Sequence, residues 1–292
     1  MTQSCVLDFP SFALHVMVRS ESGDKPDLDT DNSEDNLQAS RDVASIALSV
    51  VIPVYNEATR IQRSFADLQS FLETNCIDAE VILVDDGSTD ATAEVIGEFA
   101  AQFPNTVALS VGHTGKAGAV LAGLEIARGA IVGFVDADMA TPLDTWFSCR
   151  DELLAGASVA IASREGTGAV RVGEPWYRHL MGRAFNGLVQ VLLLPGIHDT
   201  QCGFKFFRRE AIDQILPRCM LYRDPTTITV ARVTAFDVEL LYIARRLSFR
   251  IAIIPITWTY GTHSKVNAIT DTLQNLRDVL LVRWNGWRGR YR

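Results

Sequence analysis

Residues 46–57 read IALSVVIPVYNE, residues 80–90 read EVILVDDGSTD, and residues 130–138 read AIVGFVDAD. Each begins as an apolar run rich in β-branched residues and ends in polar or acidic side chains. Such runs are typical of strands that are buried on both faces of a parallel sheet. The intervening residues 59–73, 91–103 and 115–129 are predicted helices, and residues 107–112 a further strand. This alternation predicts an α/β fold with a mostly parallel, doubly wound sheet.

The polar ends of these strands indicate where a ligand would bind. In a doubly wound sheet, ligands lie beyond the carboxyl ends of the strands. Those ends are residues 55–57, 85–88 and 136–138, and they carry five acidic side chains between them. We therefore expect the three loops to converge on one crevice.

Asp136 and Asp138 stand one residue apart at the end of a predicted buried strand. Two carboxylates in such a place are costly unless a cation neutralises them. Oxygen ligands with open positions suit Mg²⁺ or Mn²⁺ that also holds a diphosphate. Alternatively, the two side chains only cap the next turn, with Thr141-Pro142 starting a helix, and the pair by itself leaves both interpretations open.

The loop VDDGSTD (84–90) favours a nucleotide, because a capped βα turn explains Ser88 and Asp90 but not the paired Asp85-Asp86. In HTGKAGAV (113–120), Lys116 and backbone amides stand at a helix start where a phosphate can bind. The GxxxxGK[ST] spacing of a Walker loop is absent. His113 is interpreted as a hydrogen-bonded loop residue rather than a base.

Charge is distributed unevenly along the 292 residues, whose formal net charge is −8. Residues 1–46 hold nine acidic and three basic side chains, whereas residues 277–292 hold five arginines and one aspartate. This distribution argues against general nucleic-acid binding, which needs a basic face. The basic tail instead suits phosphate or an anionic lipid surface.

Residues 1–45 are predicted to be a disordered acidic leader, because they contain few large apolar groups after residue 20. Residues 46–292 then form one domain. The five cysteines include no CxxC pair, which favours a reducing compartment over a metal or disulfide framework. No run approaches the ~18 apolar residues of a spanning helix, so we expect a chain that is soluble or peripheral to a membrane.

The later part of the chain alternates less regularly. Strands are predicted at 157–165 and 251–260, and helices at 174–196, 235–247 and 271–288. Residues 176–194 and the basic C-terminal helix have aromatic, aliphatic and arginine side chains suited to a membrane interface. Ordinary core packing explains the same pattern, and both interpretations stay open.

Several quoted motifs together resemble a known family. LSVVIPVYNE (48–57), VILVDDGSTD (81–90), GKAGAVLAGLEIARG (115–129) and VDAD (135–138) resemble the family-2 glycosyltransferases. HDTQCGFKFFRREA (198–211), AFDVELLYIARRL (235–247) and WTYGTHSKV (258–266) resemble the dolichyl-phosphate sugar synthases, most closely the glucosyltransferase branch. The resemblance covers about residues 46–287. It implies a single glycosyltransferase A-type domain with C-terminal amphipathic helices, in which residues 46–142 bind nucleotide and residues 143–292 bind acceptor.

The resemblance also implies roles for individual residues. The residues expected to contact the nucleotide sugar are Pro53, Tyr55, Glu57, Asp86 and Asp136, with Lys116 beside them. The expected metal ligands are Asp136 and Asp138. The residues expected to contact the acceptor phosphate are Arg164, Arg178 and Lys205. Asp138, Arg164 and Lys205 are the expected catalytic set. The mannosyl relatives read DADLQHP where this chain reads DADMATP, so Ala140 leaves a third protein ligand in doubt.

The expected activity is inverting transfer of glucose from UDP-glucose to a polyprenyl phosphate, with a divalent cation, Mg²⁺ or Mn²⁺, as cofactor. A phosphate acceptor is largely ionised and needs no general base. The alternatives are GDP-mannose as donor, a soluble acceptor, or a non-catalytic sugar-nucleotide-binding scaffold. The expected location is the cytoplasm, including the cytoplasmic face of a membrane.

Overall fold

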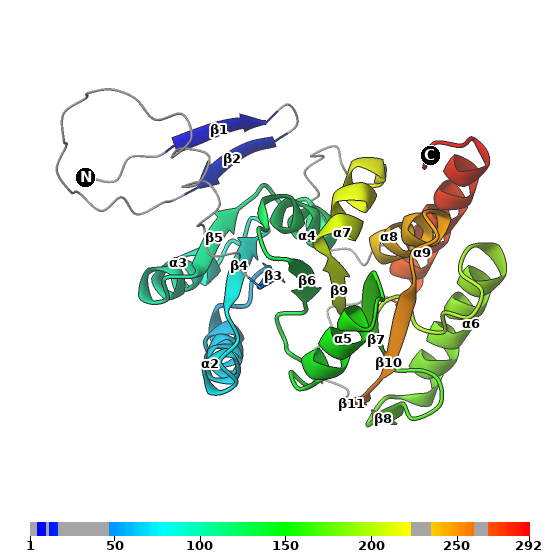
Figure 1. Ribbon diagram of the computed structural model, residues 1–292, viewed down its shortest axis with the longest axis horizontal. Helices are drawn as coiled ribbons and strands as arrows, with labels where there is room; N and C mark the ends of the chain where they lie inside the picture. The colour runs from blue at the N-terminus through cyan, green and yellow to red at the C-terminus, as the bar shows by residue number, and fades with distance from the viewer. Residues whose placement is uncertain (1–4, 10–11, 17–46, 223–234, 260–267) are drawn as a thin grey trace.

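The computed structural model describes residues 5–9, 12–16, 47–222, 235–259 and 268–292. One large sheet runs through the molecule with helices on both faces (Figure 1). Its strands are β1 (Cys5–Phe9), β2 (Phe12–Val16), β3 (Leu48–Val54), β4 (Ala79–Asp85), β5 (Thr106–Ser110), β6 (Ile131–Val135), β7 (Val159–Ser163), β9 (Phe204–Arg208) and β10 (Ile251–Pro255). A separate small sheet pairs β8 (Val170–Val172) with β11 (Thr257–Thr259). The helices are α2 (Ala58–Thr74), α3 (Thr92–Gln102), α4 (Gly115–Ile126), α5 (Thr145–Leu154), α6 (Trp176–Leu192), α7 (Arg209–Ile215), the 3₁₀ turn η1 (Leu216–Arg218), α8 (Phe236–Arg246) and α9 (Ala268–Trp287).

The strand order in the large sheet is β1-β2-β5-β4-β3-β6-β9-β7-β10. Neighbours from β5 to β6 pair in parallel, as do β7 and β10, which confirms the predicted mostly parallel α/β sheet. β9 is inserted antiparallel between β6 and β7, and the sequence did not predict it. Its run FKFFR is too short to distinguish a strand from a helix by periodicity. The sequence likewise did not predict α7 and β8, whereas a helix starting at Thr141-Pro142, close to the start of α5, was one of the two interpretations left open.

Two apolar cores flank the sheet. In β3 the side chain of Val51 belongs to the core that contains α4, α7 and α8, while Val50 and Ile52 belong to the core that contains α2 and α5. α4 lies close to the sheet because Gly123 has no side chain; a Cβ there would fall 2.3 Å from Val51 Cγ1. This close packing places the first residues of α4 at the carboxyl edge of the parallel strands.

The segment before β3 differs in part from the predicted disordered leader. β1 and β2 form an antiparallel pair, and β2 continues onto β5 through His15 and Ser110. Residues 17–46 lie outside the described residues, so the boundary at residue 45 stays a prediction. Of the helices in the described ranges, none combines the length and apolar character needed to cross a bilayer.

Candidate active site

The loops after β3 and β4 are tied together at the carboxyl edge of the sheet. Asn56 bridges them, because its backbone N–H donates to Ser88 Oγ at 3.0 Å and its Oδ1 accepts from Thr89 N at 2.8 Å. Glu57 N donates to Thr92 Oγ1 at 2.9 Å, at the start of α3. Asn56 has a φ of 50°, a left-handed conformation that asparagine tolerates. The two loops therefore form one continuous surface.

The carboxylate of Asp86 holds the start of α4. Its Oδ1 accepts from Thr114 N at 2.8 Å and Gly115 N at 3.0 Å, and its Oδ2 lies 2.8 Å from His113 Nδ1. Burial raises the pKa of Asp86 despite these hydrogen bonds. His113 also stacks on Tyr55 with ring centres 4.1 Å apart. His113 is thus a hydrogen-bonded loop residue, as the sequence indicated, and a nucleotide contact by Asp86 stays a prediction.

The three residues predicted to meet the nucleotide from β3 lie at this same edge. Pro53 and Tyr55 are partly exposed. Glu57 is also partly exposed, and its carboxylate lies 2.5 Å from Arg60 Nη2 in the first turn of α2. The fold therefore brings them together, as expected, while their contacts to a nucleotide stay predictions.

Asp136 and Asp138 follow β6 at the next position along the edge. Lys116 Nζ lies 2.5 Å from Asp136 Oδ1, so the predicted phosphate-binding lysine reaches the predicted metal ligand. Gly203 lies against the same carboxylate, because a Cβ built on it would fall 2.1 Å from Asp136 Cγ. Asp138 Oδ1 accepts from Ala140 N at 3.1 Å, which is the turn-capping contact. The fold therefore brings a cation and two carboxylates into one cluster.

Burial and neighbouring charges shift the pKa values of two members of this cluster. Burial raises the pKa of Asp138, and the charge of Asp136 raises it further. Burial alone would lower the pKa of Lys116, but the charges of Asp136 and Asp237 raise it overall. Among the residues that the structure describes, no group of three or more His, Cys, Asp and Glu side chains gathers. Metal ligation by Asp136 and Asp138 stays a prediction, with Ala140 where the third ligand was in doubt.

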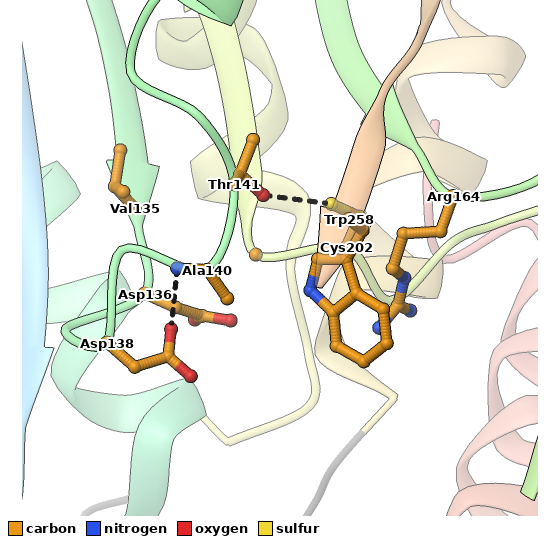
Figure 2. Close-up of a pocket in the computed structure, with 9 residues that line it drawn as sticks. Val135, Asp136, Asp138, Ala140, Thr141, Arg164, Cys202 and Trp258 are labelled. Atoms are coloured by element: carbon orange, nitrogen blue, oxygen red, sulfur yellow. Dashed lines mark hydrogen bonds between the residues drawn. The ribbon is translucent and has the colours of Figure 1, made fainter. Parts of the chain in front are cut away.

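A small pocket separates these carboxylates from Arg164 (Figure 2). Its volume is about 70 Å³. The lining residues are Val135, Asp136, Asp138, Ala140, Thr141, Arg164, Cys202, Gly203 and Trp258. Figure 2 shows the two acids on one side and Arg164 with Trp258 on the other. Opposite charges therefore face each other across one pocket.

Arg164 is held in place by Asp199, a residue to which the sequence assigned no role. Arg164 Nε and Nη2 donate to the two carboxylate oxygens at 2.8 and 2.9 Å, a bidentate pair. Asp199 is fully buried, yet the ion pair holds its pKa well below the usual range, against the effect of burial. Arg164 also lies 5.3 Å from the ring centre of Trp258. Arg178 lies in α6, and its side chain is outside the described part of the structure.

Lys205 differs from Arg164, another expected acceptor-phosphate residue, in its surroundings. Its side chain is fully buried, and its Nζ lies 2.7 Å from Asp237 Oδ1 and donates to the Cys202 carbonyl at 2.5 Å. It also lies 5.3 Å from the ring centre of Phe134. Lys205 is therefore paired with a buried carboxylate in this structure, and its contact to a phosphate stays a prediction. Burial raises the pKa of Asp237, while the lysine lowers it.

The strand order, with one antiparallel strand inserted after four parallel ones, and the acidic pair after β6 define the class of the protein. It has the sugar-nucleotide-binding architecture of the glycosyltransferase A type. The chain belongs to the family described as glycosyl transferase family 2, whose model matches residues 49–216. It is accordingly a glycosyltransferase.

Curated relatives cover most of the chain. It is 32% identical over 284 residues to the dolichyl-phosphate beta-glucosyltransferase of Homo sapiens, covering 91% of this chain and 83% of that protein. It is 30% identical over 256 residues to the enzyme of the same name from Dictyostelium discoideum, covering 83% and 75%. These similarities confirm the resemblance that the motifs indicated.

Solved structures share the fold. Mannosyl-3-phosphoglycerate synthase from Rubrobacter xylanophilus matches with a TM-score of 0.60 at 18% identity, covering 89% of this chain and 80% of its own. Glucosyl-3-phosphoglycerate synthase from Mycobacterium tuberculosis, solved with Mn²⁺ and UDP-glucose, matches with a TM-score of 0.55 at 20% identity, covering 88% and 84%. At these identities the likeness concerns the fold alone.

Proposed function

We propose that this chain transfers glucose from UDP-glucose to a polyprenyl phosphate, with inversion at the anomeric carbon. The observation that carries the proposal is the pocket between the Asp136–Asp138 pair and Arg164. Two anions must be held close together in this reaction, one diphosphate and one phosphate monoester. A carboxylate pair that takes a cation and an arginine fork across from it suit these two tasks.

Asp136 and Asp138 are the residues that would hold the divalent cation. Mg²⁺ is commonly bound by one or two carboxylates together with substrate phosphates, so a two-carboxylate site fits it without a third protein ligand. The raised pKa of Asp138 fits as well, because burial and then the charge of Asp136 disfavour its ionised form, and a cation would offset both. The cation would neutralise charge on the departing diphosphate. Lys116, 2.5 Å from Asp136 at the start of α4, would add positive charge beside it.

The acceptor phosphate is the nucleophile in this proposal. Its second pKa is about 6, so it is largely dianionic at neutral pH and needs no residue to remove a proton. One of its oxygens forms a bond to C1 of glucose while the C1–O bond to UDP breaks, and UDP leaves. Arg164 would position that phosphate, because Asp199 fixes its guanidinium at the pocket wall.

UDP-glucose is favoured as donor by the curated relatives, which are named as glucosyltransferases. The fold alone does not separate the donors, since the shared architecture includes a mannosyltransferase solved with GDP-mannose and Mn²⁺. We place the chain at the cytoplasmic face of a membrane, where UDP-glucose and a polyprenyl phosphate meet. This placement, like the donor, belongs to the proposal.

The test is transfer of labelled sugar by purified protein with Mg²⁺ or Mn²⁺. Parallel reactions contain UDP-glucose or GDP-mannose as donor, and a detergent-dispersed polyprenyl phosphate or 3-phosphoglycerate as acceptor. We expect glucosylated lipid from UDP-glucose alone, abolished by EDTA. Labelled lipid from GDP-mannose alone would overturn the donor assignment, and labelled phosphoglycerate without labelled lipid would overturn the acceptor assignment.

A pair of variants links the result to the site. Asp138→Asn removes a carboxylate from the pocket and is expected to lower kcat/KM at least about 100-fold, on the scale of losing one preorganised charge. Asp144→Asn is the matched control, because Asp144 is exposed and does not line the pocket. A kcat/KM of Asp138→Asn that equals that of active Asp144→Asn would contradict the proposed role of the acidic pair.

A further inference from the structure

The exposed face of α6 is apolar. Trp176 is 77% exposed, Leu180 60% and Val191 82%, and their spacing places them on one side of the helix. The opposite side packs Val189, with the partly buried Phe185 and Leu192, against the core, and the polar Asn186 is buried beside them. α6 is therefore apolar on both sides, whereas a surface helix of a globular protein normally has a polar outer side. The sequence left open whether this segment packs in the core or suits a membrane interface. One side of the helix packs in the core, while Trp176, Leu180 and Val191 on the other side do not.

α9 repeats this arrangement. It exposes Leu280, Trp284 and Trp287, the last of these by 69%. On its other side it buries polar groups among the apolar ones: Asn275, Asp278 and Asn285. α6 and α9 pack against each other at one end of the molecule (Figure 1). Their two apolar stripes therefore belong to one end of the fold, here called the α6–α9 face: Trp176, Leu180, Val191, Leu280, Trp284 and Trp287.

Arginines accompany the tryptophans of this face. The Arg283 guanidinium lies 4.9 Å from the ring centre of Trp287, and that of Arg288 lies 4.9 Å from the ring centre of Trp284. From Arg277 to the C-terminus, five arginines accompany one aspartate, although the whole chain has a net charge of −8. Positive charge is thus concentrated beside the exposed apolar residues.

This composition matches a bilayer surface. Tryptophan and tyrosine are enriched where membrane meets water, and arginine extends its charge to head groups while its stem stays on apolar surface. Basic residues near an anionic leaflet are attracted to it. Tryptophan and arginine are also enriched at protein–protein interfaces, so it is the excess of arginine over acidic side chains that favours an anionic lipid surface.

The face is connected to the pocket through the start of α6. Glu174, just before the helix, accepts from Arg171 Nη1 at 2.7 Å. The Arg171 guanidinium lies 5.8 Å from the ring centre of Trp258, which lines the pocket. His179 in the second turn of α6 lies 3.5 Å from Glu165, the residue after Arg164. The exposed apolar start of α6 therefore adjoins the side of the pocket that holds Arg164.

We propose that the α6–α9 face docks on an anionic lipid bilayer and orients the Arg164 side of the pocket towards a phosphate in the head-group layer. The role in acceptor delivery rests on the proposed function, whereas the docking itself does not. The bilayer is thus the source of the acceptor and the surface on which the enzyme works.

The test is co-sedimentation of the full chain with phosphatidylcholine vesicles, with and without phosphatidylglycerol, in the absence of donor and acceptor. We expect binding that is stronger with phosphatidylglycerol. The double variant Leu180→Gln/Trp284→Gln is expected to lower the partition coefficient at least about tenfold, since it removes two large apolar groups from the face. Leu154→Gln is the control, because Leu154 is 69% exposed on α5, outside the face.

Unchanged thermal unfolding of each variant verifies that it is folded. Wild-type protein that stays in the supernatant with both vesicles, or a double variant that binds like wild type, would overturn the docking. A dimer in sedimentation velocity that the same two substitutions dissociate would assign the face to a second copy and also overturn it. Vesicle binding without glucosyl transfer in the donor assay would reject the proposed function alone.

Discussion

Replacing Asp199 by asparagine isolates the ion pair that holds Arg164 at the pocket. Asp199 accepts from the backbone N–H of Arg164 at 2.9 Å as well as from two guanidinium nitrogens. Asparagine has nearly the same shape but loses the charge and one acceptor oxygen. The variant should therefore retain the fold while leaving the guanidinium without its counter-charge.

The magnitude follows from the burial of the two partners. Removing one member of a buried ion pair costs about 3–5 kcal/mol. The Arg164 side chain is 21% exposed while Asp199 is fully buried, so water partly solvates the arginine that remains. We expect a loss of about 2–3 kcal/mol, which lowers Tm by roughly 3–5 °C for a chain of this size. Asp213→Asn is the control, because Asp213 forms a more exposed ion pair with Arg209 at 3.3 Å.

The pH dependence gives a second readout. The folded-state pKa of Asp199 is lowered, so its contribution to stability is present above the unfolded pKa of about 3.9 and is lost as pH falls through the lower folded value. The difference in unfolding free energy between wild type and Asp199→Asn should be constant from about pH 5 to 8. It should shrink below about pH 4.

The assays are denaturant unfolding across this pH range and steady-state transfer with varied acceptor. Besides the lower stability, we expect KM for the polyprenyl phosphate to rise about tenfold, because Arg164 is no longer fixed. KM for the donor should change little. A variant with wild-type Tm and wild-type acceptor KM would refute the reasoning, as would a rise in donor KM alone.

Three further predictions concern residues around the pocket. Lys205→Met should lower Tm, because it leaves Asp237 buried without its partner at a cost of about 3–5 kcal/mol. The double variant Lys205→Met/Asp237→Leu should recover part of the lost Tm, as measured by thermal unfolding. Gly203→Ala should lower kcat/KM by about 100-fold with little change in Tm, because the added Cβ would displace the Asp136 carboxylate. A variant with the wild-type kcat/KM would contradict this role of the Asp136 position. Burial raises the pKa of Glu239 to about 7, so its contribution to stability is full below about pH 4.5 and is lost as pH rises through 7. The Tm of Glu239→Gln should therefore vary less with pH over that range than the Tm of wild type. Parallel curves of Tm against pH for the two proteins would disprove the raised pKa of Glu239.

The positions of β3, β4 and β6 could be predicted from sequence because their apolar runs are continuous and end in polar loops. Parallel pairing then requires those loops to meet at one edge, and Asp86, Lys116 and Asp136 do meet there. The family-level motifs likewise anticipated Arg164 at the pocket. In each case the information lies within a short segment or in a rule that applies to every such sheet.

Long-range pairing decided the rest. Lys205 is turned inward because β9 is inserted between β6 and β7, where Asp237 from α8 meets it; no local pattern in FKFFR indicates that partner. The hold of Asp199 on Arg164 spans 35 residues and depends on the same packing. The periodicity of α6 and α9 predicted two faces for each helix but not which one the core would bury, since that depends on what the neighbouring elements offer. Here they bury Asn186 and Asn285 and leave the tryptophans outside, which only the assembled tertiary structure reveals.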